Sequence, residues 1–153
     1  MTGAQDSDLH RLTYLSSSCD AMPADELDAI LDSSRRNNSR HGITGLLMYH
    51  DMQFFQTLEG SRHELEELYA RIVRDRRHSQ CLRLEFRPVA DRYFADWSMA
   101  YRSFGEFAPA DKQNFLDLTR LGRRYRGGEE SGDLRTGILI GSFLSGLRDL
   151  DFA

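Results

Sequence analysis

The middle of the chain constrains the fold most, because two strand-like segments lie there only two residues apart. Residues 42–50 (GITGLLMYH) and 53–59 (QFFQTLE) flank Asp51 and Met52. A connection of this length predicts a β-hairpin, although the turn lacks the favoured Asn-Gly pair. The hairpin lies between two helical patterns, so the segments outside those helices decide the topology of the sheet.

Both helical patterns carry recognisable end signals. The first has Pro23 in its first turn and ends before Gly42, while Ser61 and Glu64 predict a capping box at the start of the second. Three further segments alternate between apolar and polar residues and are predicted to be strands: 11–17, 81–89 and 97–104. The order β-α-β-β-α-β-β predicts an α+β, ferredoxin-like sheet with an extra strand and with both helices on one face.

The C-terminal part is expected to cover the other face of the sheet. It is predicted to contain helices at residues 109–121 and 136–150, joined by a polar linker at 123–133. We therefore expect two parts, a ligand-binding domain at 10–104 and a helical extension at 105–153.

Composition limits the partners and the location of the protein. The net charge of −4 argues against nucleic acid as a partner, and no apolar run approaches the roughly 18 residues of a membrane span. Cys19 and Cys81 are the two cysteines, which have no metal-type spacing and, without a secretory signal, predict a cytoplasmic protein. Gly137, Gly141 and Ser145 recur every four residues in the last helix, and this small-residue stripe favours a homo-oligomer as an alternative or addition to docking on the sheet.

Five residues are candidates for a functional site because the predicted fold brings them together. Tyr14 and Gln56 lie within the two strands expected side by side at the centre of the sheet, and Asn38 follows the apolar stripe of the first helix. Trp97 and Met99 lie two residues apart and share a face if the last strand is regular there. Each residue alone has a plainer interpretation: a core tyrosine, a solvated glutamine, a helix C-cap, or a gap-filling methionine.

The same residues lie in motifs that resemble a known family over residues 12–104. The motifs are LTYLSS, NNSRHGITGLLMY, FFQTLEG, RDRRHS and FADWSMAY, in this order. Together they resemble the BLUF domains, the blue-light sensors that use flavin. The resemblance implies a ferredoxin-like fold with a flavin between its two helices, FAD in most cases, with FMN or riboflavin as alternatives.

The resemblance also implies roles for individual residues. Excited flavin would take an electron and then a proton from Tyr14 through Gln56, whose amide would return rearranged and would shift the absorption to the red. Trp97 and Met99 would relay the signal. The implied cofactor-binding residues are Asn37, Asn38, Leu47, Phe54, Gln56, Ile72, Arg74, Asp75, Arg77 and His78. For the basic residues of this set, a solvated helix end that favours the helix dipole is an equal alternative.

The output of such a sensor would have to leave the chain. The part after Phe104 is too short for a cyclase or phosphodiesterase domain, so we expect a stand-alone, non-enzymatic receptor that signals to a downstream effector protein. A flavin-dependent oxidoreductase and a cofactor-free oligomeric adaptor are the alternatives. An acylphosphatase-like hydrolase is disfavoured, because the loop SSSCDAMP after the first strand contains no basic residue.

Overall fold

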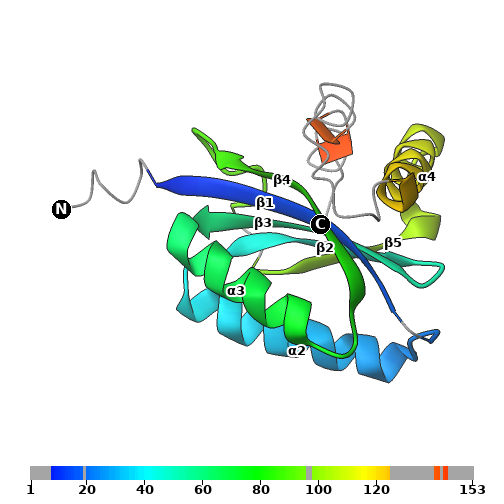
Figure 1. Cartoon of the computed structure of the whole chain (residues 1–153), viewed down its shortest axis with the longest axis horizontal. Coiled ribbons are helices and arrows are strands. Elements are labelled where there is room, and N and C mark those ends of the chain that lie inside the picture. Colours follow the sequence, from blue (N-terminus) through cyan, green and yellow to red (C-terminus); the bar gives the residue numbers. More distant parts are fainter. Residues whose placement is uncertain (1–7, 19, 96–97, 125–139, 142, 145–153) are drawn as a thin grey trace.

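The computed structural model describes residues 8–18, 20–95, 98–124, 140–141 and 143–144 of the chain. Its elements are β1 (Leu9–Ser17), α2 (Ala24–Arg40), β2 (Thr44–His50), β3 (Gln53–Ser61), α3 (Arg62–Arg74), β4 (Ser79–Pro88), β5 (Ala100–Ser103), a 3-10 turn (Phe104–Glu106) and α4 (Pro109–Arg124). The strands form one sheet in the order β4-β1-β3-β2-β5 (Figure 1). β5 runs parallel to β2, and the other neighbours are antiparallel. The predicted α+β, ferredoxin-like fold is confirmed, with β1 and β3 side by side at its centre.

Local chemistry explains the hairpin and the start of α3. Asp51 and Met52 both have positive φ values, 50° and 63°, so the turn adopts the left-handed geometry that suits a two-residue hairpin, without the usual Asn-Gly residues. Ser61 caps α3 by accepting a hydrogen bond from the Glu64 backbone N–H. The Glu64 carboxylate lies 2.9 Å from His41 Nδ1, which ties the start of α3 to the end of α2.

The fifth strand is shorter than the sequence predicts. Residues 98–99 precede the strand, which begins at Ala100, and Phe104 already starts a 3-10 turn. The carbonyl oxygens of Ser98 and Met99 accept hydrogen bonds from side chains of α2, so α2 holds this stretch beside the end of the sheet. The prediction of a regular strand over 97–104 was therefore wrong at both ends, and Trp97 lies outside the described residues.

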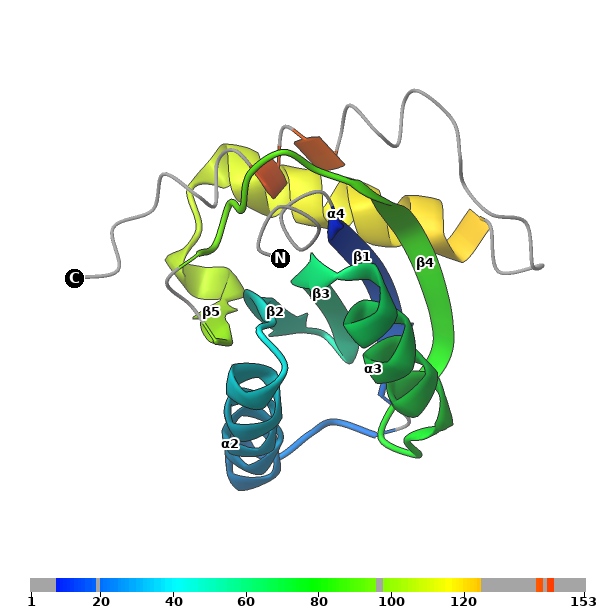
Figure 2. The ribbon, with the colours of Figure 1, turned by 90° about the vertical axis from the view of Figure 1, so that its left-hand side faces the viewer.

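Helices cover both faces of the sheet, in two separate cores. α2 and α3 lie on one face, whereas α4 and residues 140–144, where described, lie on the other (Figure 2). The expected cover over the second face is thus present. Its apolar core joins strand residues to the C-terminal helices: Leu46, Phe55, Phe94, Phe107, Phe115, Leu118, Ile140, Phe143 and Leu144 are all buried.

The rest of the predicted C-terminal part is only partly described. α4 extends to Arg124, three residues beyond the predicted end at 121. Residues 123 and 124 of the predicted linker are therefore helical, and its remainder, together with Gly137 and Ser145 of the small-residue stripe, lies outside the described residues. None of the helices in the described ranges has the length and apolarity needed to cross a membrane.

Candidate functional site

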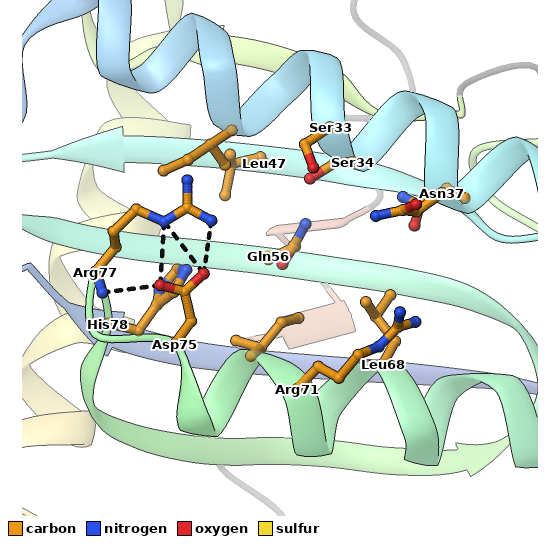
Figure 3. A pocket seen from close by; sticks show the side chains of 13 residues that line it. Ser33, Ser34, Asn37, Leu47, Gln56, Leu68, Arg71, Asp75, Arg77 and His78 are labelled. Atoms are coloured by element: carbon orange, nitrogen blue, oxygen red, sulfur yellow. Dashed lines mark hydrogen bonds and ion pairs between the residues drawn. The ribbon is translucent and has the colours of Figure 1, made fainter.

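The face of the sheet that α2 and α3 cover contains a pocket between these two helices (Figure 3). It holds about 690 Å³ of space free of protein atoms, part of it open to solvent. The lining residues come from both helices, from β2 and β3, and from the connection after α3: Ile30, Ser33, Ser34, Asn37, Asn38, Leu47, Gln56, Leu68, Arg71, Ile72, Asp75, Arg77 and His78.

Tyr14 and Gln56 form a directly bonded pair at the floor of this face. The antiparallel register of β1 and β3 places them opposite each other, so their side chains project to the same side of the sheet. The Tyr14 hydroxyl donates a hydrogen bond to Gln56 Oε1. Tyr14 is fully buried and Gln56 is 5% exposed, so Gln56 is not on a solvated face, the alternative that its polarity suggests.

The nitrogen of the Gln56 amide has a much weaker partner than its oxygen. Nε2 donates to Met99 Sδ at 3.4 Å, and a thioether is a poor acceptor. Met99 is 2% exposed and belongs to the apolar cluster on this face. The buried amide therefore points its oxygen at the phenol and its nitrogen at a sulfur that gives it little stabilisation.

The surroundings of Tyr14 hold its proton firmly at neutral pH. Burial raises the pKa of the phenol well above its ordinary value of 10, and the negative charges that Cys81, Tyr69 and Asp75 can carry raise it further. The Tyr69 ring lies 5.4 Å from the Tyr14 ring, centroid to centroid. Desolvation disfavours the phenolate, so Tyr14 keeps its proton at neutral pH.

Asn38 is buried beside the pocket and bonds the stretch that carries Met99. Its Nδ2 donates to the Ser98 carbonyl oxygen at 2.9 Å, and the residue is 2% exposed. Arg35, three residues earlier on α2, donates through Nε to the Met99 carbonyl at 3.0 Å. His41 is the C-cap of α2, so the alternative interpretation of Asn38 as the helix cap was wrong.

Charged residues gather at the end of the pocket next to the C-terminus of α3. The Asp75 carboxylate accepts hydrogen bonds from the Arg77 guanidinium at 2.6–3.1 Å (Figure 3), and this pairing lowers the pKa of Asp75. His78 Nδ1 lies 2.8 Å from Ser16 Oγ, and burial lowers the pKa of the imidazole. An ion pair and a neutral histidine therefore border the pocket on this side.

Eight of the ten implied cofactor-binding residues line the pocket, and two do not. Phe54 is fully buried and packs its ring against Tyr49 and His78, at 4.7 and 4.6 Å between centroids. Arg74 is exposed and donates to the Ala70 carbonyl of its own helix. Neither residue is among those that line the pocket.

Five lining residues were not among the predicted cofactor contacts: Ile30, Ser33, Ser34, Leu68 and Arg71. Helical spacing is the signal that finds them. Ser33 and Ser34 lie one turn before Asn37 and Asn38, and Leu68 lies one turn before Ile72. A set of pocket residues predicted from short motifs alone therefore leaves out residues one helical turn before each motif.

The family comparison matches the part of the chain that builds this pocket. Residues 9–100 match the BLUF family model, described as sensors of blue-light using FAD. Among curated proteins, the chain is 37% identical over 95 residues to the photoactivated adenylate cyclase subunit beta of Euglena longa. It is 33% identical over 96 residues to the subunit alpha of Euglena gracilis. These matches cover 61% of the chain but only 11% and 9% of the relatives, so the chain spans about a tenth of their length.

Solved structures match over a larger part of the chain. BlrB, a BLUF protein in its dark state, is 36% identical with a TM-score of 0.65, and the match covers 88% of this chain and 98% of BlrB. The photo-activated state of BlsA is 28% identical with a TM-score of 0.72, and covers 94% and 96% of the two chains. A bacterial light-regulated adenylyl cyclase is 32% identical with a TM-score of 0.69, over 75% of this chain and 35% of the cyclase.

Proposed function

The chain belongs to the BLUF family of blue-light sensors, and from this premise we propose that Tyr14 and Gln56 carry a light reaction in the pocket between α2 and α3. The observation that supports this most is the hydrogen bond from the Tyr14 hydroxyl to Gln56 Oε1, because Gln56 also lines the pocket. A buried phenol is thereby connected to a bound ligand through one amide group.

The chemistry of the lining residues fits a flavin. Apolar side chains from both helices and from β2, namely Ile30, Leu47, Leu68 and Ile72, suit a flat ring system. The Asn38 amide donates to Ser98 and accepts no hydrogen bond at Oδ1 from any residue the structure describes. Amide groups carry donors and acceptors at one tip, so Asn38 and Gln56 would meet the carbonyl and ring-edge groups of a flavin.

The residues of the chain would perform a proton transfer and an amide rearrangement. When bound, a flavin absorbs blue light and its excited ring accepts an electron. Loss of an electron makes the Tyr14 phenol strongly acidic, and Gln56 Oε1 is the acceptor that already holds its proton in a hydrogen bond. When the electron and the proton return to Tyr14, the Gln56 amide would come back with its donor and acceptor ends exchanged, and its nitrogen would give up only the Met99 thioether.

We propose FAD as the flavin, as the family description names it. Arg71 lines the pocket from α3 and is exposed, so its guanidinium is free to reach a phosphate group at the pocket rim. FMN carries a phosphate too, and riboflavin carries none. Chromatography of the flavin released by heat from the purified protein separates the three.

We propose that the signal leaves through the helices on the opposite face of the sheet. In this division, residues 10–104 sense light, and residues 105–153 form the output part that contacts an effector protein or a second copy of the chain. The relatives named above include light-regulated adenylyl cyclases, which supports a role for the sensor domain in controlling a partner.

The absorption spectrum of the purified protein tests the proposed function. We expect a yellow protein whose blue absorption band shifts reversibly to the red under blue light and recovers in darkness. A colourless protein that takes up no added FAD would contradict the proposal. A yellow protein without the reversible shift, but with turnover of a reduced nicotinamide, would indicate an oxidoreductase instead.

A further inference from the structure

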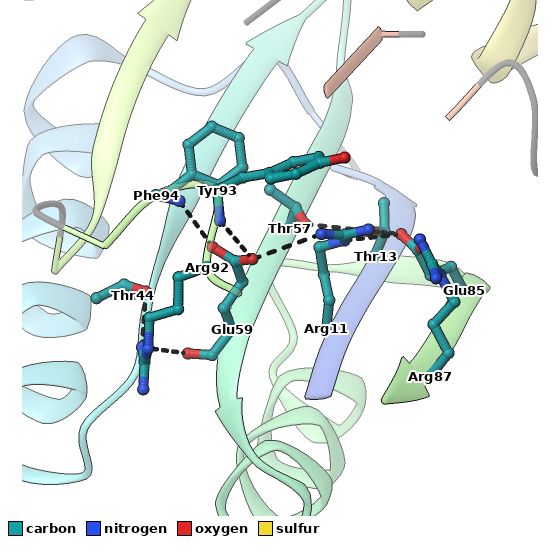
Figure 4. Close-up of polar contacts among 10 residues, drawn as sticks. All are labelled: Arg11, Thr13, Thr44, Thr57, Glu59, Glu85, Arg87, Arg92, Tyr93 and Phe94. Carbon is teal, nitrogen blue, oxygen red and sulfur yellow. Dashed lines mark hydrogen bonds and ion pairs between the residues drawn. The ribbon is translucent and has the colours of Figure 1, made fainter. Parts of the chain in front are cut away.

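Glu59 connects β3 to the loop between β4 and β5 on the face of the sheet opposite the pocket. The side chain is fully buried, and its two carboxylate oxygens accept hydrogen bonds from two consecutive backbone amides of that loop (Figure 4). Oε2 accepts from the Tyr93 N–H at 2.9 Å and Oε1 from the Phe94 N–H at 2.8 Å. The Arg11 guanidinium lies 3.6 Å from Oε2 and 4.4 Å above the Tyr93 ring. One carboxylate thereby fixes the start of the stretch that leads to Met99.

Arg92 reinforces the same attachment from within the loop. Its guanidinium donates to Thr44 Oγ1 at 2.8 Å and to the Glu59 carbonyl oxygen at 3.0 Å (Figure 4). It also donates to the Gly42 carbonyl oxygen at 2.8 Å. These acceptors lie on β2, on β3 and in the connection before β2. The beginning of the stretch is therefore bound to the sheet by the Glu59 side chain from β3 and by the Arg92 side chain from the loop.

The far end of the stretch is bound to the pocket. Ser98 lies four residues after Phe94, and its carbonyl oxygen accepts from Asn38. The next residue, Met99, receives the hydrogen bond from Gln56 Nε2. Four residues span at most about 14 Å, so the fixed first end limits where the second end can lie. Gln56 and the carboxylate that holds the first end lie on the same strand, three residues apart.

We propose that Glu59 is a positioning residue of the photoreaction, which holds Met99 against Gln56 through the amides of Tyr93 and Phe94. This inference rests on the proposed function. The Gln56 amide must leave Met99 when it reverses and must regain it in darkness. A tightly held Met99 makes that exchange slower, and a loosely held one makes it faster.

The pair Glu59→Gln and Glu85→Gln tests this role with a matched control. Glutamine keeps the size of glutamate but offers one acceptor oxygen in place of two, so one loop amide loses its partner in Glu59→Gln. Glu85 also faces Arg11, with Oε2 at 3.5 Å from Nε, and it accepts hydrogen bonds from Thr13 on β1 and Arg87 on β4. Both variants remove a charge beside the same arginine, and Glu59→Gln also removes an acceptor of the loop.

We expect both variants to keep the flavin and the reversible red shift. Glu59→Gln should recover in darkness about three- to tenfold faster than the unaltered protein, the rate equivalent of one hydrogen bond, and Glu85→Gln should stay close to the unaltered rate. The methyl NMR signal of Met99 is assigned through Met99→Leu. In the dark state, its chemical shift should differ from that of the unaltered protein in Glu59→Gln but not in Glu85→Gln, which a general loss of stability would not produce.

Equal recovery rates and an unmoved Met99 signal in Glu59→Gln would overturn the positioning role. If Glu59→Gln does not fold, amide hydrogen exchange in the unaltered protein replaces it: the Tyr93 and Phe94 amides should be protected in darkness and stay protected in light, and exchange as fast as that of an exposed loop amide would overturn the proposal. An unaltered protein that binds flavin without any reversible shift would overturn the proposed function instead, so the two failures are distinguishable.

Discussion

The two faces of β3 bury polar groups in opposite ways. On the pocket face, the Gln56 amide bonds Tyr14 through its oxygen but only the Met99 thioether through its nitrogen. On the other face, each oxygen of the Glu59 carboxylate accepts a backbone amide, and Arg11 lies beside it. A buried group with weak partners can exchange them cheaply, whereas a fully bonded buried carboxylate cannot. One face is thus suited to rearrange, and the other to hold its geometry while that happens.

Removal of the phenol on the pocket face should have the largest effect. Tyr14→Phe keeps the ring but removes the group that donates to Gln56, so we expect complete loss of the reversible red shift with the flavin still bound. Tyr69→Phe is the matched control, because it removes a phenol whose ring lies 5.4 Å away. Absorption spectra before and after blue light check both variants. A surviving shift in Tyr14→Phe would refute the role of Tyr14.

Leucine substitutions on the two faces of β3 should differ in stability. Glu59→Leu strands two buried amides and removes a partner of Arg11, which should cost about 3 kcal/mol or more. Gln56→Leu gives up only a thioether contact at the amide nitrogen but leaves the buried Tyr14 hydroxyl without its acceptor, and should cost about 1–2 kcal/mol. Urea unfolding of the flavin-free proteins gives both values. Equal costs would mean that the two faces do not differ as described.

The fold and the centre of the site follow from local sequence patterns. Alternation and helix end signals predict the order of elements, and that order alone places Tyr14 and Gln56 on adjacent central strands. The backbone conformation of the turn at Asp51 and Met52 was harder to predict, because both residues have positive φ, which Asp tolerates but which is uncommon for Met. Local chemistry is a weak guide wherever tertiary contacts decide the backbone.

Contacts between distant segments could not be predicted. Nothing in the sequence indicates that Glu59 accepts the amides of Tyr93 and Phe94, since the partners are more than thirty positions apart and are backbone groups. The late start of β5 at Ala100 has the same origin, because side chains of α2 donate hydrogen bonds to the carbonyl oxygens of residues 98 and 99. Hydrogen bonds to the backbone leave no residue-type signal at the position whose backbone group takes part.

Two arginines one turn apart on α3 should differ in their effect on flavin affinity. Arg71 lines the pocket, whereas Arg74 donates to the Ala70 carbonyl and does not. Arg71→Ala should weaken FAD binding about tenfold, through loss of one charge-assisted contact with a phosphate, and Arg74→Ala should leave it nearly unchanged. Fluorescence titration of the flavin-free proteins measures both affinities. A larger loss of FAD affinity in Arg74→Ala than in Arg71→Ala would indicate that Arg74, and not Arg71, contacts the phosphate.

The smallest effect should be a pH dependence of stability that comes from His78, at the charged end of the pocket face. Burial lowers the pKa of its imidazole, Asp75 opposes this, and Arg77 adds to it. Ser16 Oγ lies 2.8 Å from its Nδ1, and the rings of Tyr14 and Phe54 pack beside it.

A lowered pKa in the folded protein means that the unfolded chain binds more protons below its ordinary pKa of 6.5. The contribution of His78 is therefore complete above pH 6.5 and is lost as the pH falls through the lowered value. The free energy of unfolding, measured with urea at pH 7.5 and 5.5, should fall more in the unaltered protein than in His78→Gln. His63→Gln, on the exposed side of α3, controls for the loss of an imidazole as such. An equal fall in His78→Gln and the unaltered protein would show that the imidazole does not titrate differently on folding, and that the pocket face is more solvated at this end than its burial indicates.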